Sequence, residues 1–311
     1  MQFDVEQRES RLDKYLALKL PRISRTKLQR LIKNGAVKVN GVFVIKPAAT
    51  LRPHDRIILL EEKVLAPGNE EFKIEPEPEI SLEVIYVDAD ILVVNKQAGL
   101  LVHPTLTQKR HTLANALMAR YPEIEKIGES PLRPGIVHRL DQNTSGLIIV
   151  AKNQIAFEFI KKQFLERQVT KKYMALVEGV PEKLESVIEY DLRPSKHNRL
   201  KKVAIQKFEV TKKSRRTAKT FYKVVQTFTD KFALLEVSPQ TGRTHQIRVH
   251  LSAIHHPVVG DGMYGSKSKI AKRQMLHAAK LEFIAPSGEK LLLEAPLPED
   301  FKKTLEKISK E

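Results

Sequence analysis

RPGIVHRLDQNTSGLIIVAKN, residues 133–153, changes character at its midpoint. Its first half is polar and rich in turn-forming residues, and its second half is an apolar run of strand length. Polar loops that lead directly into rigid elements are common places for functional sites. The sequence therefore predicts a buried strand over residues 146–152, with a candidate site on the loop before it.

Polar side chains crowd the end of this loop: His138, Arg139, Asp141, Asn143, Thr144 and Ser145. A loop aspartate can perform chemistry, but it can equally form a turn or one half of a structural ion pair. Ser145 precedes Gly146, yet the G-x-S-x-G pattern of a hydrolase nucleophile is not present. The residues alone leave both roles open for Asp141 and disfavour a serine hydrolase.

Other short apolar runs indicate further strands at ILVVNK (91–96), FALLEV (232–237) and LLLEA (291–295). Residues 111–120 and 154–167 have helical spacing of their apolar side chains. Strands and helices do not alternate strictly along the chain. We therefore predict an α+β fold with a mixed, largely antiparallel sheet rather than a doubly wound one.

A second polar cluster follows at residues 237–265, VSPQTGRTHQIRVHLSAIHHPVVGDGMYG. His245, His250 and His255 recur every five residues, a spacing that does not place them on one helical face, so a metal site is disfavoured. Arg243 and Arg248 flank QIRVHL, which we interpret as a strand. Each arginine could pair with a carboxylate or bind a phosphate through two nitrogens.

The composition limits the classes of function. The 311 residues contain 54 Lys+Arg and 37 Asp+Glu, a net charge of +17, which favours a polyanionic partner such as nucleic acid. Cysteine is absent, which excludes disulfides, thiolate metal sites and cysteine nucleophiles. The start lacks the apolar run of a signal peptide, and no apolar stretch approaches the length of a membrane span. We expect a cytoplasmic protein that does not contact membranes.

Charge and proline divide the chain. Residues 1–60 contain 13 Lys+Arg and 5 Asp+Glu, whereas residues 61–80 contain 7 acids, 2 bases and three prolines. Such an acidic, proline-containing segment is typical of an extended linker. We predict a small basic module at 1–62, a linker at 63–80 and a larger domain at 81–311.

The small module is predicted to contain two helices and a hairpin. Ser10 and Asp13 resemble a capping box ahead of one helix, and Ser24 is a candidate N-cap of the next. Asn40-Gly41 is a strong hairpin signal. One face of the second helix carries bases with no acid between them, which favours a phosphate-binding surface: Arg22, Arg25, Lys27, Arg30 and Lys33. The pattern resembles the small RNA-binding module of a small-subunit ribosomal protein and of tyrosyl-tRNA synthetases.

The larger domain resembles the RluA-type pseudouridine synthases. HRLDQNTSGL (138–147) is similar to the signature of that family, and further motifs follow in the same order: NKQAGLLVHP (95–104), KKYMALVEG (171–179), GRTHQIRVHL (242–251), GDGMYG (260–265) and LHAAKLEFIAPSGEKLLLEAPLP (276–298). Gln97 and Gln142-Asn143 depart from the more common proline and Lys-Asp. The N-terminal module resembles the appendage of members that modify large-subunit ribosomal RNA.

This resemblance implies isomerisation of uridine to pseudouridine in RNA, without metal or cofactor. It assigns Asp141 as the essential carboxylate, Arg248 as its partner and Tyr173 as the residue that stacks on uracil. Arg139 would enter the space that a flipped-out uridine leaves in the RNA. The remaining expected substrate-binding residues are His138, Thr144, Arg243, Arg25, Lys27 and Arg30.

We expect the RNA substrate to be large-subunit ribosomal RNA and the enzyme to be a monomer. Transfer RNA is the alternative substrate. A non-catalytic RNA-binding factor for ribosome assembly is the alternative class, although a pure binder has no need of a buried carboxylate facing a polyanion.

Overall fold

The computed structural model describes residues 1–6, 8, 11–21, 23, 25–60, 73–105, 107–195, 198, 200–205 and 217–310. These residues divide into two compact units, Met1–Phe72 and Lys73–Glu311. Of the expected linker, residues 63–72 lie outside the described residues, whereas Ile74, Glu77 and Ile80 are buried in the larger unit. None of the helices described in either unit is both long and apolar enough to cross a bilayer.

The N-terminal unit contains helices α1 (Leu12–Lys19) and α2 (Arg25–Lys33) and strands β1 (Gln2–Asp4), β2 (Val37–Val39), β3 (Val42–Phe43) and β4 (Arg56–Leu59). The strands form an antiparallel sheet in the order β1-β4-β2-β3. Asn40 and Gly41 have φ values of 51° and 81°, as a type I′ turn requires, so the predicted hairpin is confirmed. β1 and β4 extend this hairpin and were not predicted.

Asp13 has a different role from the predicted one. Ser10, Arg22 and Ser24 lie outside the described residues, and Arg11 occupies the N-cap position of α1, so the predicted capping box is wrong. The fully buried Asp13 carboxylate instead accepts hydrogen bonds from Arg11, Arg25 and Gln29. The Arg11 hydrogen bond contributes most to holding the pKa of Asp13 well below its usual range. Asp13 therefore ties α1 to α2.

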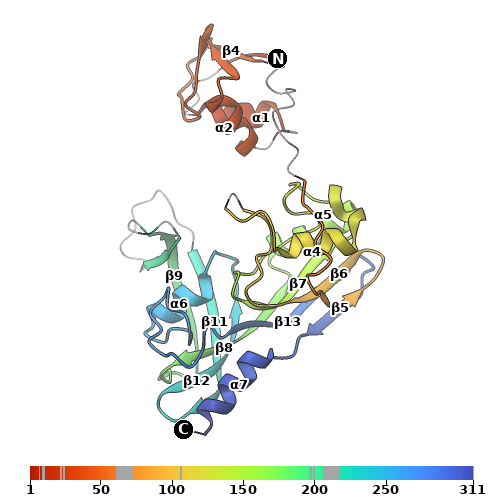
Figure 1. The fold of residues 1–311 in the computed structure, drawn as a ribbon. Coiled ribbons are helices and arrows are strands. Elements are labelled where there is room, and N and C mark those ends of the chain that lie inside the picture. Colours follow the sequence, from red (N-terminus) through yellow and green to blue (C-terminus); the bar gives the residue numbers. More distant parts are fainter. Residues whose placement is uncertain are drawn as a thin grey trace. The chain divides into compact units, whose positions relative to one another are not determined.

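The larger unit is built on a sheet with short helices on it (Figure 1). Its strands are β5 (Glu83–Val87), β6 (Ile91–Lys96), β7 (Ser145–Ala151), β8 (Thr170–Glu178), β9 (Glu185–Pro194), β10 (Lys202–Ile205), β11 (Thr217–Phe228), β12 (Phe232–Pro239), β13 (Leu276–Ile284) and β14 (Lys290–Glu294). The helices are α4 (Leu113–Arg120), η1 (Pro122–Lys126, a 3₁₀ turn), α5 (Gln154–Glu166), α6 (Gln246–Ala253) and α7 (Glu299–Ile308).

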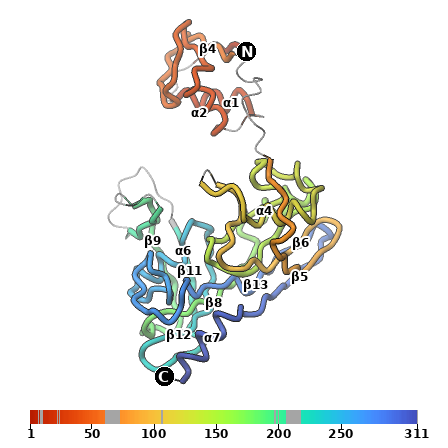
Figure 2. Tube along the Cα trace, in the orientation of Figure 1, coloured from red at the N-terminus to blue at the C-terminus, as the bar shows by residue number. Residues whose placement is uncertain are grey.

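The strand order is β10-β9-β11-β12-β8-β13-β7-β6-β5, with β14 paired to β13. Figure 2 shows the late strand β13, drawn in blue, crossing the middle of the unit, where it pairs with the earlier strands β8 and β7. The β13–β7 pair is parallel, and the other strand pairs of the described sheet are antiparallel. The predicted α+β class with a mixed, largely antiparallel sheet is confirmed.

The apolar runs predicted as strands form β6, β7, β12 and β14, and the predicted helices form α4 and α5. The interpretation of QIRVHL as a strand is wrong, because these residues form α6. Ile247, Leu251 and Ile254 follow helical spacing and pack together in one core cluster. Gln246 favours the helix start, because its side-chain oxygen accepts the backbone N–H of Arg243.

Gly146 brings the polar loop of residues 137–144 onto the sheet. Its φ of +117° belongs to a region that L side chains rarely adopt, and a Cβ built here would lie 2.3 Å from the carbonyl oxygen of Ala278. β7 can approach β13 this closely only because position 146 is glycine. The end of the loop is therefore held at the centre of the sheet, beside β8 and α6.

Candidate active site

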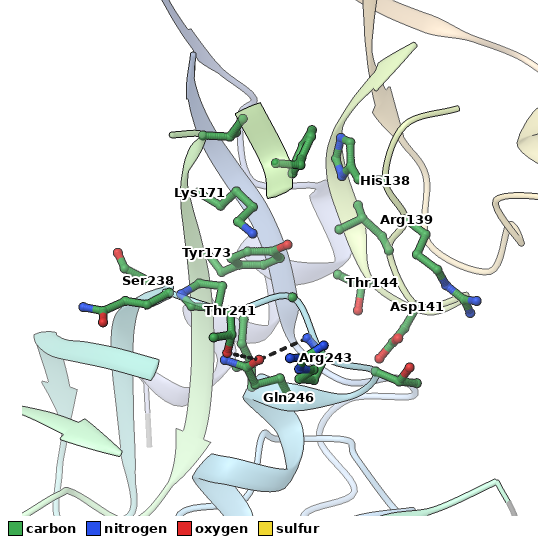
Figure 3. Close-up of a pocket in the computed structure, with 18 of the residues that line it drawn as sticks. His138, Arg139, Asp141, Thr144, Lys171, Tyr173, Ser238, Thr241, Arg243 and Gln246 are labelled. Atoms are coloured by element: carbon green, nitrogen blue, oxygen red, sulfur yellow. Dashed lines mark hydrogen bonds between the residues drawn. The ribbon is translucent and has the colours of Figure 1, made fainter. Parts of the chain in front are cut away.

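A cavity of about 970 Å³ opens beside the loop that precedes β7. Its walls come from residues 137–141 and 144, the C-terminal end of α5, the start of β8 and residues 238–248. Figure 3 shows Asp141, Tyr173 and Arg243 around this space, although they come from three separate parts of the chain. The sequence-predicted residues His138, Arg139 and Thr144 also line it. Both polar clusters identified in the sequence therefore meet at one cavity.

Asp141 is held by a guanidinium. Arg248 Nη1 donates to Asp141 Oδ2 at 2.9 Å, and the Asp141 side chain is 17% exposed at the cavity. Arg248 also donates from Nε (2.6 Å) and Nη2 (2.9 Å) to the buried carboxylate of Asp261. One guanidinium thus donates hydrogen bonds to two carboxylates, and it holds the Asp141 carboxylate at the cavity wall.

The charge of Arg248 is stable in this setting. Burial opposes the charge, but the hydrogen bonds and the negative charge of Asp261 outweigh burial and raise the pKa of Arg248 above its usual value. The guanidinium also lies over the ring of Tyr264, 4.9 Å from its centroid. Asp261 therefore keeps Arg248 in place independently of Asp141.

His245 closes the other side of Asp141. Its Nε2 lies 3.8 Å from Asp141 Oδ1, and its Nδ1 is 2.8 Å from the Tyr264 hydroxyl. Burial lowers the pKa of His245, although the charge of Asp141 opposes this shift. His245 was considered in the sequence only as a metal ligand. The structure instead places it beside the carboxylate, with φ at 58°.

Tyr173 lies on β8, with its ring facing the cavity (Figure 3). Burial raises the pKa of Tyr173, and the negative charge of Asp141 adds to the shift. The phenol is therefore neutral at physiological pH. It can stack on a planar group and donate a hydrogen bond, but it is not available as a phenolate base.

The expected substrate-binding residues differ in their surroundings. Arg139 and Arg243 are exposed side chains on the cavity wall. Thr144 is buried and accepts a hydrogen bond from Gln274. Arg25, Lys27 and Arg30 lie on α2 of the other unit; Arg25 pairs with buried Asp13, and Lys27 and Arg30 are exposed.

His138 supports the loop through its ring. Its Nε2 accepts the backbone N–H of Ile149 at 2.9 Å, and the ring stacks on Phe164 with centroids 4.6 Å apart. Burial lowers the pKa of His138 to about 3, and the charge of Lys171 adds to the shift. The neutral imidazole therefore accepts the backbone hydrogen bond of Ile149 that a neighbouring strand would otherwise accept.

We expect His138→Gln to fold, because a glutamine oxygen can also accept the Ile149 N–H. In the wild type, the unfolded chain binds a proton at His138 below about pH 6.5 and the folded chain does not until about pH 3. His138 therefore lowers the free energy of unfolding by up to about 1.4 kcal/mol for each pH unit as the pH falls through that range. Urea unfolding between pH 7 and 4.5 should show the wild type losing more stability than His138→Gln. Parallel pH dependences would contradict the assignment.

Two supporting residues were missed in the sequence. Lys96 is 1% exposed, and its ammonium donates to the carbonyl oxygens of Gln97, Leu100 and Gln142, which fixes the loop just after Asp141. Burial lowers the pKa of Lys96 to about 7. Asp261 lies in GDGMYG, at the end of the second polar cluster, where the sequence pattern assigned it no role of its own. Neither residue stands in a pattern that indicates its partner.

The chain is similar in sequence to known proteins. Residues 90–253 match the model of the RNA pseudouridylate synthase family, and residues 10–57 match the S4 domain. An uncharacterized RNA pseudouridine synthase of Bacillus subtilis (strain 168) is 39% identical over 307 residues, covering 98% of this chain and 96% of the relative. A ribosomal large subunit pseudouridine synthase D of Neisseria meningitidis serogroup A is 39% identical over 305 residues, covering 93% and 76%.

A solved structure is also similar. Human RNA pseudouridylate synthase domain containing 1 superposes with a TM-score of 0.57 at 28% identity, covering 75% of this chain and 97% of that one. The family match spans the loop of Asp141, β8 with Tyr173 and α6 with Arg248. The chain therefore belongs to the RNA pseudouridylate synthase family and carries an S4 domain in its N-terminal unit.

Proposed function

We propose that this enzyme converts uridine to pseudouridine in large-subunit ribosomal RNA and that Asp141 is its catalytic carboxylate. The observation that carries the proposal is the Arg248–Asp141 ion pair on the wall of a large open cavity. Relatives such as the ribosomal large subunit synthase of Neisseria, which this chain matches over 93% of its length, support this substrate class. We also propose that the enzyme is a monomer and that it acts in the cytoplasm.

The isomerisation exchanges two bonds to the sugar. The bond from N1 of uracil to C1′ breaks, the base turns, and a bond from C5 to C1′ forms. The hydrogen on C5 leaves as a proton and N1 gains one, so atoms and electrons balance without a cofactor. Asp141 can attack the ring, attack C1′ or remove the 2′ proton. Each route uses the carboxylate of Asp141, which the guanidinium of Arg248 holds at the cavity wall.

Tyr173 and Arg139 support this step in different ways. The neutral ring of Tyr173 offers a stacking surface for the detached base, and such stacking contributes about 1–3 kcal/mol per base. The exposed Arg139 lies at the cavity, where it can fill the space left in the RNA by the flipped nucleotide. Because unpaired bases flip at a smaller energetic penalty, we expect a target uridine in a loop.

The experiment measures tritium release from RNA labelled at C5 of uridine, because formation of the C5–C1′ bond expels that hydrogen. The substrates are ribosomal RNA from cells that lack the enzyme and, in parallel, transfer RNA. Release from ribosomal RNA alone supports the proposal, and release from transfer RNA alone shifts the substrate class. Tight binding without release from either RNA would favour the non-catalytic binding factor.

We expect the exposed bases of α2 to contact RNA phosphates. Replacing Lys27 and Arg30 with alanine removes two such contacts, so the slope of log K against log salt should become shallower by about 1.4, at about 0.7 per phosphate on single-stranded RNA. Lys14→Ala with Lys19→Ala removes the same charge from α1 and is the matched control. Deleting residues 1–60 should flatten the slope further while leaving some isomerisation of a short RNA. Equal slopes for the two double variants would refute the role of α2.

A further inference from the structure

Lys171 presents an ammonium to the cavity that the mechanism above does not use. It lies two residues before Tyr173 on β8, so the two side chains share one face of the strand. Figure 3 shows its amine directed into the space above the Tyr173 ring. The amine is 5.6 Å from the centroid of Phe164. Among the described residues, no carboxylate lies within 4.0 Å of this amine.

The neighbouring lysine has the opposite arrangement. Lys172 points to the other face of β8, where its amine pairs with Glu236 at 2.9 Å. Lys172 therefore has a carboxylate as its counterion. Lys171 is instead partly buried, and burial lowers its pKa. A partly desolvated ammonium without a carboxylate partner is complementary to an anion from the ligand. In an RNA, that anion is a backbone phosphate.

Arg167 lies at the same end of the cavity and shows backbone strain. It is the C-cap of α5, with φ 61° and ψ 31°, a left-handed conformation that usually selects glycine. The conformation is unfavourable for arginine by about 1–2 kcal/mol. Its backbone N–H closes the helix onto Gln163 and Phe164, which glycine would do equally well. The exposed arginine side chain on the cavity wall therefore has a reason other than stability.

The other nearby base is already neutralised. Lys161 also lines this end, but its amine pairs with Glu129. Lys171 and Arg167 thus remain as cations beside neutral His138 and Phe164. Two residues along a strand span about 6.7 Å. This is comparable to the distance from a base stacked on Tyr173 to a phosphate of the same or the next nucleotide.

We propose that Lys171 and Arg167 form a phosphate subsite at the junction of α5 and β8, which holds the RNA backbone next to the nucleotide bound at Tyr173. The choice of nucleotide rests on the proposed function, whereas the binding of a phosphate does not. Lys171 is the inner contact of the subsite, and Arg167 is the contact at the rim. Both residues position the RNA strand that enters the cavity.

The test measures the salt dependence of binding to fluorescein-labelled oligouridylate. All proteins carry Asp141→Asn, so that no reaction occurs during the titration. Loss of one phosphate contact makes the log–log slope shallower by about 0.7. We expect this change for Lys171→Met and again for Arg167→Gly, and no change for Lys172→Met, which removes the same charge from the opposite face. Arg167→Gly should also melt at a higher temperature than its parent, because the strain is relieved.

The outcomes separate the possible roles. Weaker binding of Lys171→Met with an unchanged slope would indicate a contact to a base carbonyl and would overturn the subsite. An equal change of slope in Lys172→Met would indicate only the general field of the protein and would overturn it as well. If the salt slopes of Lys171→Met and Arg167→Gly change but the wild-type enzyme releases no tritium, the phosphate subsite is supported and the proposed function is rejected. Tritium release with unshifted slopes would reject the subsite alone.

Discussion

Asp141→Asn is expected to lower the rate of tritium release from uridine-labelled ribosomal RNA by on the order of 10⁴- to 10⁶-fold, the range seen when a central catalytic residue is removed. Asparagine keeps the size of aspartate but cannot ionise, so it can neither attack carbon nor accept the 2′ proton. The measurement is a single-turnover rate with enzyme in excess, because that rate excludes product release.

The same substitution should leave the fold intact. Arg248 keeps both hydrogen bonds to Asp261, and its remaining Nη1 donor can meet the asparagine oxygen. We therefore expect RNA affinity within a few-fold of wild type and a similar melting temperature. Asp230→Asn makes the same chemical change in an exposed turn and serves as the control. A rate for Asp141→Asn within tenfold of the control would remove Asp141 from the mechanism.

The sequence predicted those strands and helices whose pattern of apolar residues matches their burial in the folded protein. Residues 91–94 and 146–151 are continuously apolar because β6 and β7 are buried on both faces, so a short apolar run was sufficient to identify each strand. The strand interpretation of QIRVHL was wrong because its polar and apolar residues alternate, which is the pattern of a half-buried strand, whereas in α6 the polar Gln246, Arg248 and His250 are buried as well. Its helical spacing becomes clear only when Ile254, outside the six residues QIRVHL, is included.

The candidate site was less accessible to prediction than the fold. Asp141 and Arg248 are separated by 107 positions, so no periodicity connects them, and only family resemblance paired them. Lys171 and Lys172 are adjacent and chemically identical, and the structure alone shows that one faces the cavity and the other Glu236. Asp261 is one acid in a glycine-rich loop until its burial against Arg248 is known. Long-range pairs of charges require the tertiary structure.

Arg248→Met is expected to reduce the free energy of unfolding of the larger unit by about 3–5 kcal/mol, the usual penalty for removing one partner of a buried ion pair. The side chain of Arg248 is 7% exposed and that of Asp261 1%, so Asp261 would be left as an isolated buried carboxylate. Asp141 would lose its partner at the same time. Activity should fall with stability, because the guanidinium that holds the Asp141 carboxylate at the cavity is gone. Urea unfolding and single-turnover tritium release measure the two effects.

A second substitution separates these two effects. Arg248→Met combined with Asp261→Leu removes the isolated buried charge, and apolar replacements of buried ion pairs are often neutral or stabilising. We therefore expect the double variant to regain most of the lost stability and none of the lost activity. Lys303→Met breaks an exposed pair with Glu299 and should change stability by no more than about 0.5 kcal/mol. If Arg248→Met were as mild as Lys303→Met, or if the double variant recovered activity, Arg248 would not be the residue that holds the Asp141 carboxylate for the reaction.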